Sequence, residues 1–164
     1  MTRISTRTQK RLAHLRRRRQ REKDRQAPAR ASSQHRFDAS LRIAGVGAYH
    51  DEIFSRTGIA STHSHRKGEL RGRSPALGCW TEDLWRLESP LGELATIDQH
   101  LEWLQAQIAP HKAYFAGLCA RGEWADLCLG CLSESPYPVL RASPGALAMM
   151  KDLGLGLSFN FTCV

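Results

Sequence analysis

The sequence predicts an α+β fold in which an antiparallel-rich, four-stranded sheet carries its helices on one face. Two observations lead to this prediction. Segments with alternating apolar and polar residues, typical of half-buried strands, are separated by segments whose apolar residues recur every three or four positions, typical of helices. Every predicted strand also keeps one polar side, which indicates a sheet with one open face. The predicted order is β-α-β-α-α-β-α-β, or two weakly repeated β-α-β halves.

The 36 N-terminal residues differ in composition from the rest of the chain. They contain 13 Lys and Arg residues against 2 acidic residues, a net charge of +11. Residues 37–164 contain 11 Lys and Arg residues against 14 acidic residues, a net charge of −3. A highly charged segment without periodic apolar residues cannot bury enough surface to offset its ordering entropy. We therefore predict a disordered basic tail over residues 1–36 and a single α+β domain over residues 37–164.

The tail contains a block of four arginines, Arg16-Arg17-Arg18-Arg19, which is the candidate for nucleic-acid association. A plain solvated tail and translation from an upstream start codon are competing interpretations, and an organelle transit peptide is a further one. No run of about 18 apolar residues could span a membrane. The cysteine count of five is odd, and no secretory signal precedes the cysteines, so we expect reduced thiols and a cytoplasmic location.

The first half of the domain begins with a strand over residues 37–44, where apolar and polar residues alternate. A short helix follows, with Asp51 and Glu52 in its first turn and Gly58 as its C-terminal stop. The residues of this helix expected to face inward are Ile53, Phe54 and Thr57. Residues 59–78 predict a long polar loop, and loops of this length are often functional.

A strand over residues 79–89 and the helix after it form the centre of the predicted fold. Thr96 and Gln99 have the spacing of a capping box, which marks the start of the helix. Its apolar stripe is Ile97, Leu101, Leu104 and Ile108. After an interruption at Pro110, a second helix ends at Gly122. The apolar residues of this second helix are Tyr114, Phe115, Leu118 and Cys119.

The C-terminal part predicts a strand, a loop, a helix and a second strand. Residues 125–131 alternate as in a strand, and the two prolines of residues 134–138 predict a loop. Ser143 and Pro144 have the composition of an N-cap and first helical residue. The residues that this helix is expected to bury are Leu147, Met150 and Leu153. Residues 155–163 show the clearest strand alternation in the chain.

Short segments occur in a distinctive order and spacing: Asp51-Glu52-Ile53, Thr57-Gly58-Ile59, Arg66-Lys67-Gly68-Glu69, Leu84-Trp85-Arg86-Leu87-Glu88-Ser89, His100-Leu101-Glu102, and Ser143-Pro144 with Leu153-Gly154. On these segments, residues 37–163 resemble an uncharacterised bacterial family, the domain of unknown function four-two-seven-nine. The chain departs from that pattern where relatives tend to have a proline before the acidic pair, here Tyr49-His50, and a threonine at Phe54. The resemblance implies an α+β domain without an established activity, and the basic tail lies outside it.

Few residues are candidates for chemistry. Cys128 and Cys131 have the spacing of half a zinc site, but residues three apart on a strand point to opposite faces. His63 and His65 would need a carboxylate such as Glu69 to form a metal site. We expect His100 to be a partly buried, hydrogen-bonded histidine. The sequence contains no nucleotide-binding glycine motif and no nucleophile elbow, so we expect no catalytic residue, metal or cofactor.

These observations favour a small binding module that recognises a partner protein, for example in the manner of immunity proteins that neutralise toxins. The open sheet face, with Ser40, Arg42, Asp126, Ser158 and Asn160, and the polar loop beside it are the expected recognition surface. The residues expected to bind the partner are Arg66, Lys67, Glu69, Trp85, Arg86 and Glu88. Nucleic-acid association through the tail and an enzyme that uses the loop at residues 60–69 remain the alternatives.

Overall fold

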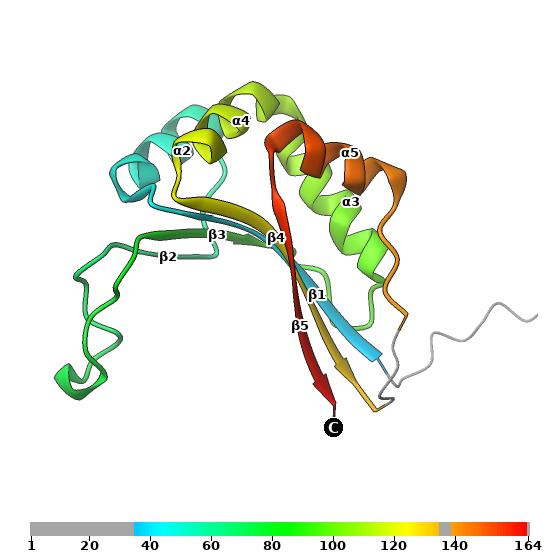
Figure 1. Cartoon of the computed structure of the whole chain (residues 1–164), viewed down its shortest axis with the longest axis horizontal. Helices are drawn as coiled ribbons and strands as arrows, with labels where there is room; N and C mark the ends of the chain where they lie inside the picture. Colours follow the sequence, from blue (N-terminus) through cyan, green and yellow to red (C-terminus); the bar gives the residue numbers. More distant parts are fainter. Residues whose placement is uncertain (1–34, 135–138, 164) are drawn as a thin grey trace, which may run out of the picture. The chain divides into compact units, whose positions relative to one another are not determined.

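The computed structural model describes residues 35–134 and 139–163, which form a curved five-stranded sheet with helices on its convex face (Figure 1). The chain divides into two units, residues 1–32 and 33–164. The predicted tail interaction at Arg16 to Arg19 lies outside the described residues, as does most of the predicted loop at residues 134–138. Within the described part of the chain, no helix is long and apolar enough to cross a membrane.

The sheet has the strand order β2-β3-β1-β4-β5. Its strands are β1 (His35–Ala44), β2 (His63–His65), β3 (Leu84–Glu88), β4 (Trp124–Ser133) and β5 (Gly156–Cys163). The central strand β1 pairs antiparallel with β3 and β4, and β2 pairs antiparallel with β3. Only the last pair of strands in this sheet, β4 and β5, is parallel. The prediction of an antiparallel-rich sheet with helices on one face is therefore confirmed.

The predicted number of strands was wrong, because the structure has a fifth strand within the predicted loop at residues 59–78. This strand, β2, contains only His63, Ser64 and His65, and its three residues pair with residues 84–86 of β3. A strand of three polar residues has no apolar alternation, so its pairing depends on backbone hydrogen bonds that the sequence pattern does not show. The element order gains one strand at this point.

The two β-α-β halves are not structural repeats. The first and third strands of the sequence, β1 and β3, are antiparallel, whereas β4 and β5 are parallel. The connection between β4 and β5 contains a helix, as a parallel pair requires, because a short turn cannot return the chain to the same end of the sheet. The shared sequence of elements in the two halves therefore leads to different strand pairing.

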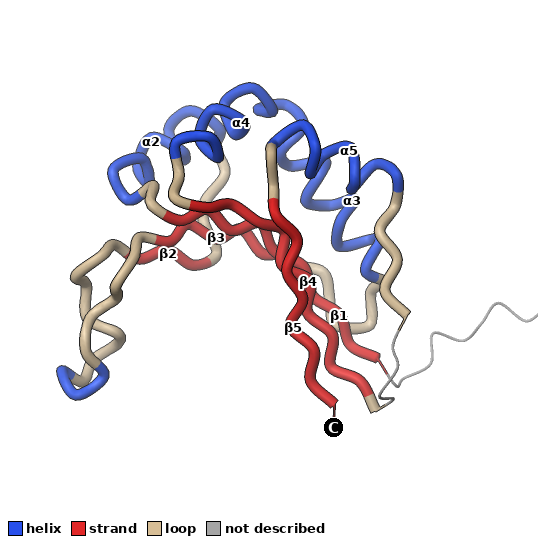
Figure 2. The backbone as a smooth tube through the Cα atoms, in the orientation of Figure 1, coloured by secondary structure: helices blue, strands red, loops and turns tan. Residues whose placement is uncertain are grey.

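The helices pack as one layer against the sheet (Figure 2). They are α2 (His50–Thr57), α3 (Ile97–Ile108), α4 (Lys112–Arg121) and α5 (Pro144–Leu153), with short 3-10 turns at Gly47–Tyr49 and Ala109–His111. A further 3-10 turn, Pro75–Leu77, lies outside this layer. The capping box of α3 is present as predicted, since the Thr96 side chain accepts from the Gln99 backbone N–H and the Gln99 side chain accepts from that of Thr96. The predicted apolar stripe of α3 is buried, from Ile97 to Ile108.

Two of the shorter helices bury different residues from those predicted. In α2, Ile53 is buried but Phe54 is 58% exposed. In α5, Leu147 is 52% exposed, whereas Ala146 and Met149 are buried together with Leu153. In a helix of eight to ten residues, several apolar residues occupy adjacent positions. Periodicity alone therefore does not show which of two neighbouring apolar residues faces the core.

Three strands depart from the predicted boundaries or burial. Strand β1 begins at His35, two residues before the predicted start of the domain, and β3 begins at Leu84 rather than at residue 79. Strand β5 forms as its alternation predicts, but its apolar side chains remain largely exposed because it lies at the edge of the sheet. The exposed apolar residues of β5 are Leu157, Phe159 and Phe161.

Candidate functional site

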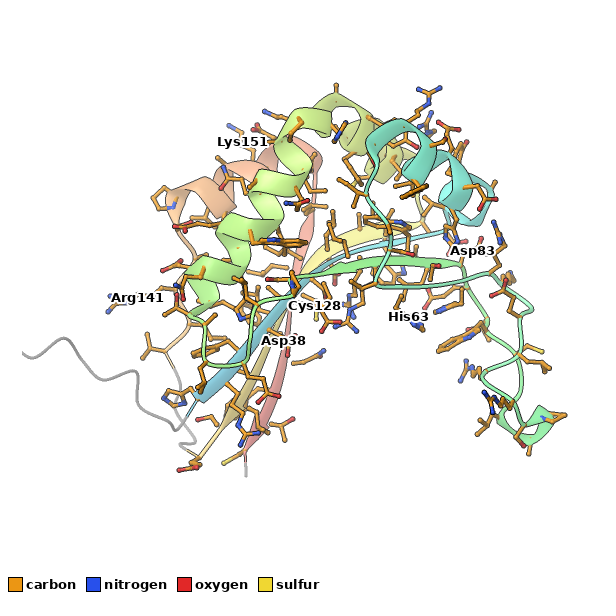
Figure 3. All side chains as sticks on the ribbon, turned by 180° about the vertical axis from the view of Figure 1, so that it is seen from behind. Asp38, His63, Asp83, Cys128, Arg141 and Lys151 are labelled. Carbon is orange, nitrogen blue, oxygen red and sulfur yellow. The ribbon has the colours of Figure 1, made fainter. Side chains whose placement is uncertain are left out.

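The face of the sheet opposite the helices is polar and forms the candidate site. The strand registers place alternate residues of all five strands on this side. Figure 3 shows Asp38, His63 and Cys128 there, on the side away from the helices. We call this surface the open face and define it by Asp38, Ser40, Arg42, His63, His65, Arg86, Glu88, Asp126, Cys128, Ser158 and Asn160.

Arg42 anchors a hydrogen-bond network at the centre of the open face. Its guanidinium donates to both carboxylate oxygens of Asp126, from Nε to Oδ1 at 2.9 Å and from Nη2 to Oδ2 at 2.6 Å. Nη2 also donates to Ser158 Oγ at 2.9 Å, and the guanidinium lies 5.4 Å from the ring centre of Trp124. The hydrogen bonds to Asp126 raise the pKa of Arg42 above its ordinary value. A bidentate pair of this kind fixes the position of both side chains.

A second arginine lies beside the first on the neighbouring strand. Arg86 is the register partner of Arg42, and like charges directly opposite each other on adjacent strands repel. Arg86 pairs with Glu88 on its own strand at 3.2 Å, while Arg42 pairs with Asp126, so each cation has its own carboxylate. The pair of Arg42 with Asp126 crosses from β1 to β4, whereas Arg86 and Glu88 lie on one strand.

The Asp38 carboxylate fits into the space left by a glycine on the neighbouring strand, which has no side chain. Its register partner is Gly130, and a Cβ atom at Gly130 would collide with the Asp38 carboxylate. Deeper in the same face, Ser40 is fully buried and Cys128 is 2% exposed. Asn160 Nδ2 lies 3.3 Å from Cys128 Sγ, so the amide donates to the sulfur. The middle of the open face is therefore closely packed.

The predicted separation of Cys128 and Cys131 agrees with the structure. Cys128 contacts Asn160 on the open face, whereas Cys131 belongs to the alternate set that includes the core residue Leu129. Burial raises the pKa of the Cys131 thiol. All five cysteines are free. Among the residues that the structure describes, no three His, Cys, Asp or Glu side chains are grouped as metal ligands.

Residues 66–83 form a projecting hairpin, which we call the arm (Figure 1). Its two sides are joined by backbone hydrogen bonds from Gly68 N to Trp80 O and from Trp80 N to Glu69 O, both 2.8 Å, and from Arg71 N to Gly78 O at 2.9 Å. The tip contains the 3-10 turn Pro75–Leu77. The segment predicted as an irregular loop is therefore partly ordered, and Figure 1 shows it projecting on the side of the open face.

The base of the arm is tied to the domain by the residues predicted to bind a partner. The Arg66 guanidinium donates to the carbonyl of Gly47 at 3.1 Å and pairs with Asp51 at 3.2 Å. The backbone N–H of Lys67 donates to Asp83 Oδ1 at 2.7 Å, and that of Arg66 donates to Glu69 Oε2 at 2.9 Å. The Lys67 side chain remains exposed.

Two histidines and a tryptophan join the arm to the open face. The rings of His65 and Trp80 are stacked, 3.7 Å apart between centroids and 10° from parallel. His65 Nδ1 lies 3.3 Å from His63 Nε2, and burial, followed by the charge of His63, lowers the pKa of His65. This stack was not predicted from the sequence. The available signal was the alternating His-Ser-His, which places both rings on one side of a strand.

The six residues predicted to bind a partner lie in three places. Arg86 and Glu88 lie on the open face, and Arg66, Lys67 and Glu69 lie at the base of the arm. Trp85 is 1% exposed and its ring lies 5.6 Å from that of Phe115 in the core. It points to the helices because adjacent residues of a strand face opposite ways. Trp85 therefore supports the site from behind without forming part of its surface.

His100 is more deeply buried than predicted and lacks the expected hydrogen bond. It is 1% exposed, and neither ring nitrogen has a hydrogen-bond partner among the described residues. Burial lowers its pKa, against a smaller opposite effect of Asp38 and Glu88. A buried polar group without a partner reduces stability by about 1–3 kcal/mol. His100 therefore lowers the stability of the domain, and its packing in the core does not explain why a histidine is present there.

We expect His100→Leu to raise the free energy of unfolding, and to raise it more at pH 5.5 than at pH 7.5. In the unfolded chain the imidazole takes up a proton near its ordinary pKa of about 6.5. In the folded chain it does so only at lower pH, so native stability falls as the pH drops below about 6.5, and Leu removes this loss. Urea unfolding at the two pH values measures the difference. An equal gain at both values would contradict the assignment to His100.

The described fold and site define a class of protein, the α+β domains with an open polar sheet face and a projecting arm. The chain belongs to the family described as a domain of unknown function (DUF4279), whose model matches residues 33–163. The resemblance seen in the sequence is thereby confirmed. No curated protein matches the chain. No solved structure matches it either.

Proposed function

We propose that the domain is a binding module that recognises a partner protein with its open face and arm. The observation that carries this proposal is the preformed network of Arg42, Asp126 and Ser158 beside the pair of Arg86 and Glu88. Side chains held by mutual hydrogen bonds lose little further entropy on binding, so they suit a rigid recognition surface. Charged and polar groups in fixed positions mainly supply specificity and a fast encounter.

The arm supports this proposal because it adds exposed basic and apolar groups next to the face. Its exposed cations include Lys67, Arg71 and Arg73, and Leu70 and Leu77 are 53% and 60% exposed. Large apolar side chains exposed together with charges are typical of interaction surfaces. The arm is held at its base, where Arg66 contacts Gly47 and Asp51, while its tip is available to a partner.

We further propose that the partner is neutralised by this contact, in the manner of immunity proteins, which are small and block a toxin by binding it. This part of the proposal is an analogy based on size, on the mildly acidic charge of residues 37–164 and on the recognition surface. It predicts that the partner carries a surface complementary to both Arg86 on the open face and Lys67 at the base of the arm.

Capture of proteins from the native host by the immobilised full chain tests the proposal. We expect Arg86→Ala and Lys67→Ala to lose the captured protein while their melting temperatures stay near that of the unchanged protein, because exposed or half-exposed charges contribute about 1 kcal/mol or less. Lys112→Ala is the matched control, since Lys112 pairs with Asp152 on the helical side and should retain capture. Full capture by both open-face variants would place the site elsewhere.

The basic tail is the basis of the alternative function, association with nucleic acid. Binding of this kind depends on phosphate contacts and is released by salt, about a thousandfold between 50 and 200 mM for six or more contacts. Replacement of Arg16, Arg17, Arg18 and Arg19 by Gln should then weaken binding of a DNA duplex and leave protein capture unchanged. Loss of protein capture in that variant would favour the tail over the open face.

A further inference from the structure

The edge strand β5 carries an apolar row that the helices leave uncovered. Leu157, Phe159 and Phe161 are 40%, 54% and 45% exposed. Their register partners on β4 are nearly or fully buried, and these are Leu127, Leu129 and Cys131. The row therefore lies on the core side of the sheet. The apolar layer of the core continues onto β5, where nothing in the described part of the chain covers it.

Strand β5 also lacks the features that normally protect the edge of a sheet. Natural edges are kept from pairing by charges, prolines, bulges or short length. Residues 156–163 contain no charge and no proline, and their register with β4 runs without a break. The opposite edge, β2, has only three residues and is followed directly by Arg66 and Lys67. One edge is thus blocked, and the other is suited to accept a strand.

We propose that β5 pairs antiparallel with β5 of a second copy of the chain, around a two-fold axis at Phe159. In this register Phe159 meets the Phe159 of the second copy, and Leu157 meets Phe161. The spacing of two between these residues keeps the whole apolar row of both copies on the core side. Such an isologous contact closes at two subunits and produces a continuous ten-stranded sheet.

The absence of charge on β5 favours a second copy as the occupant, and the small apolar area limits the expected affinity. A strand without charged residues can pair with itself without like-charge repulsion. A buried aromatic side chain contributes roughly 150–250 Å², so the exposed halves of two phenylalanines amount to roughly 200 Å² per copy. A standard interface buries about 800 Å² per partner. Backbone pairing between the two β5 edges adds to this apolar contact. The expected dimer is weak and concentration-dependent.

The dimer would leave the open face free, so this inference is independent of the proposed partner. A two-fold axis perpendicular to the sheet keeps the helices of both copies on one side and both open faces on the other. Residues such as Arg42 and Arg86 remain accessible in each copy. Loss of dimerisation and loss of partner capture can therefore be measured separately.

Light scattering of the full chain over a dilution series, combined with charge substitutions at position 159, tests the proposal. We expect the unchanged protein to form dimers, and Phe159→Lys and Phe159→Glu each to be monomeric, because two like charges would face each other at the axis. An equimolar mixture of the two variants should regain dimers. Only pairing of position 159 with itself produces this rescue. Phe54→Lys is the matched control, since Phe54 is 58% exposed on α2 and should leave dimers intact.

A monomer at every concentration of the unchanged protein would overturn the proposal, as would dimers that survive Phe159→Lys or a mixture that stays monomeric although both variants are folded. Open-ended assemblies would also overturn it. Hydrogen exchange of the unchanged protein provides a test without substitutions. The backbone N–H groups of residues 156–163 should become protected as the concentration rises, and exchange that does not depend on concentration would contradict pairing through β5.

Discussion

Trp85→Ala is expected to reduce the free energy of unfolding by about 3–5 kcal/mol, the cost of removing a large aromatic side chain from a core. The indole is 1% exposed and packs against Phe115 between β3 and the helices. The substitution leaves a cavity directly behind the open face. A loss of this size is a large part of the total stability of a small domain. Equilibrium unfolding in urea measures the change.

Trp124→Ala is the matched control for this experiment. Trp124 is 37% exposed, and its ring meets the Arg42 guanidinium, so its removal should cost only about 1 kcal/mol. A loss at Trp124 as large as that at Trp85 would contradict the assignment of Trp85 to the core. The adjacent substitution Arg86→Ala should have a small effect on stability and a large one on capture, because residues 85 and 86 face opposite sides of β3.

Arg42→Met is expected to destabilise the domain by about 2–4 kcal/mol, because it leaves the Asp126 carboxylate without its two charge-assisted hydrogen bonds. The Asp126 side chain is only 14% exposed and that of Arg42 26%, so water replaces the lost partner poorly. Thermal or urea unfolding of the single variants and of the double variant Arg42→Met with Asp126→Leu forms a double-mutant cycle.

The double variant should recover most of the stability that each single variant loses, since an apolar pair of similar volume avoids a buried, unpaired charge. We nevertheless expect the double variant to capture less partner, because the polar network would be gone while the fold remains. Additive losses in the cycle would show that Arg42 and Asp126 act independently. That result would remove the network as the basis of the recognition surface.

Longer elements with strong periodicity were predictable from the sequence, and the shortest element was not. Strand β1 and helix α3 have clear repeats of two and of three to four residues, and both formed near the expected positions. Strand β2 has three polar residues and owes its pairing to the backbone of β3, which is distant in the sequence. The exposure of Phe159 was also unpredictable, since alternation indicates a strand but does not show whether it lies at an edge.

The candidate site could be predicted as a face but not as a network. Alternation was sufficient to place Arg42, Arg86, Asp126 and Ser158 on the open side of a sheet. The pairing of Arg42 with Asp126 required the register of β1 with β4, which depends on contacts between residues 84 positions apart. Trp85 was predicted as a partner-binding residue because it is adjacent to Arg86 in the sequence, although the side chains of adjacent residues on a strand point to opposite faces of the sheet.

The central position of β1 has a consequence for folding during synthesis. Among the described strands β1 is made first, but the strand on one of its two edges, β4, begins about 80 residues after β1 ends. At about 5–20 residues per second, the ribosome needs roughly 4–16 s to make that segment. Until then one edge of β1 stays unpaired. Its apolar residues, such as Leu41 and Ile43, lack the neighbouring strand on that side. The emergence of β4 is therefore the step at which the nascent chain can first close its core.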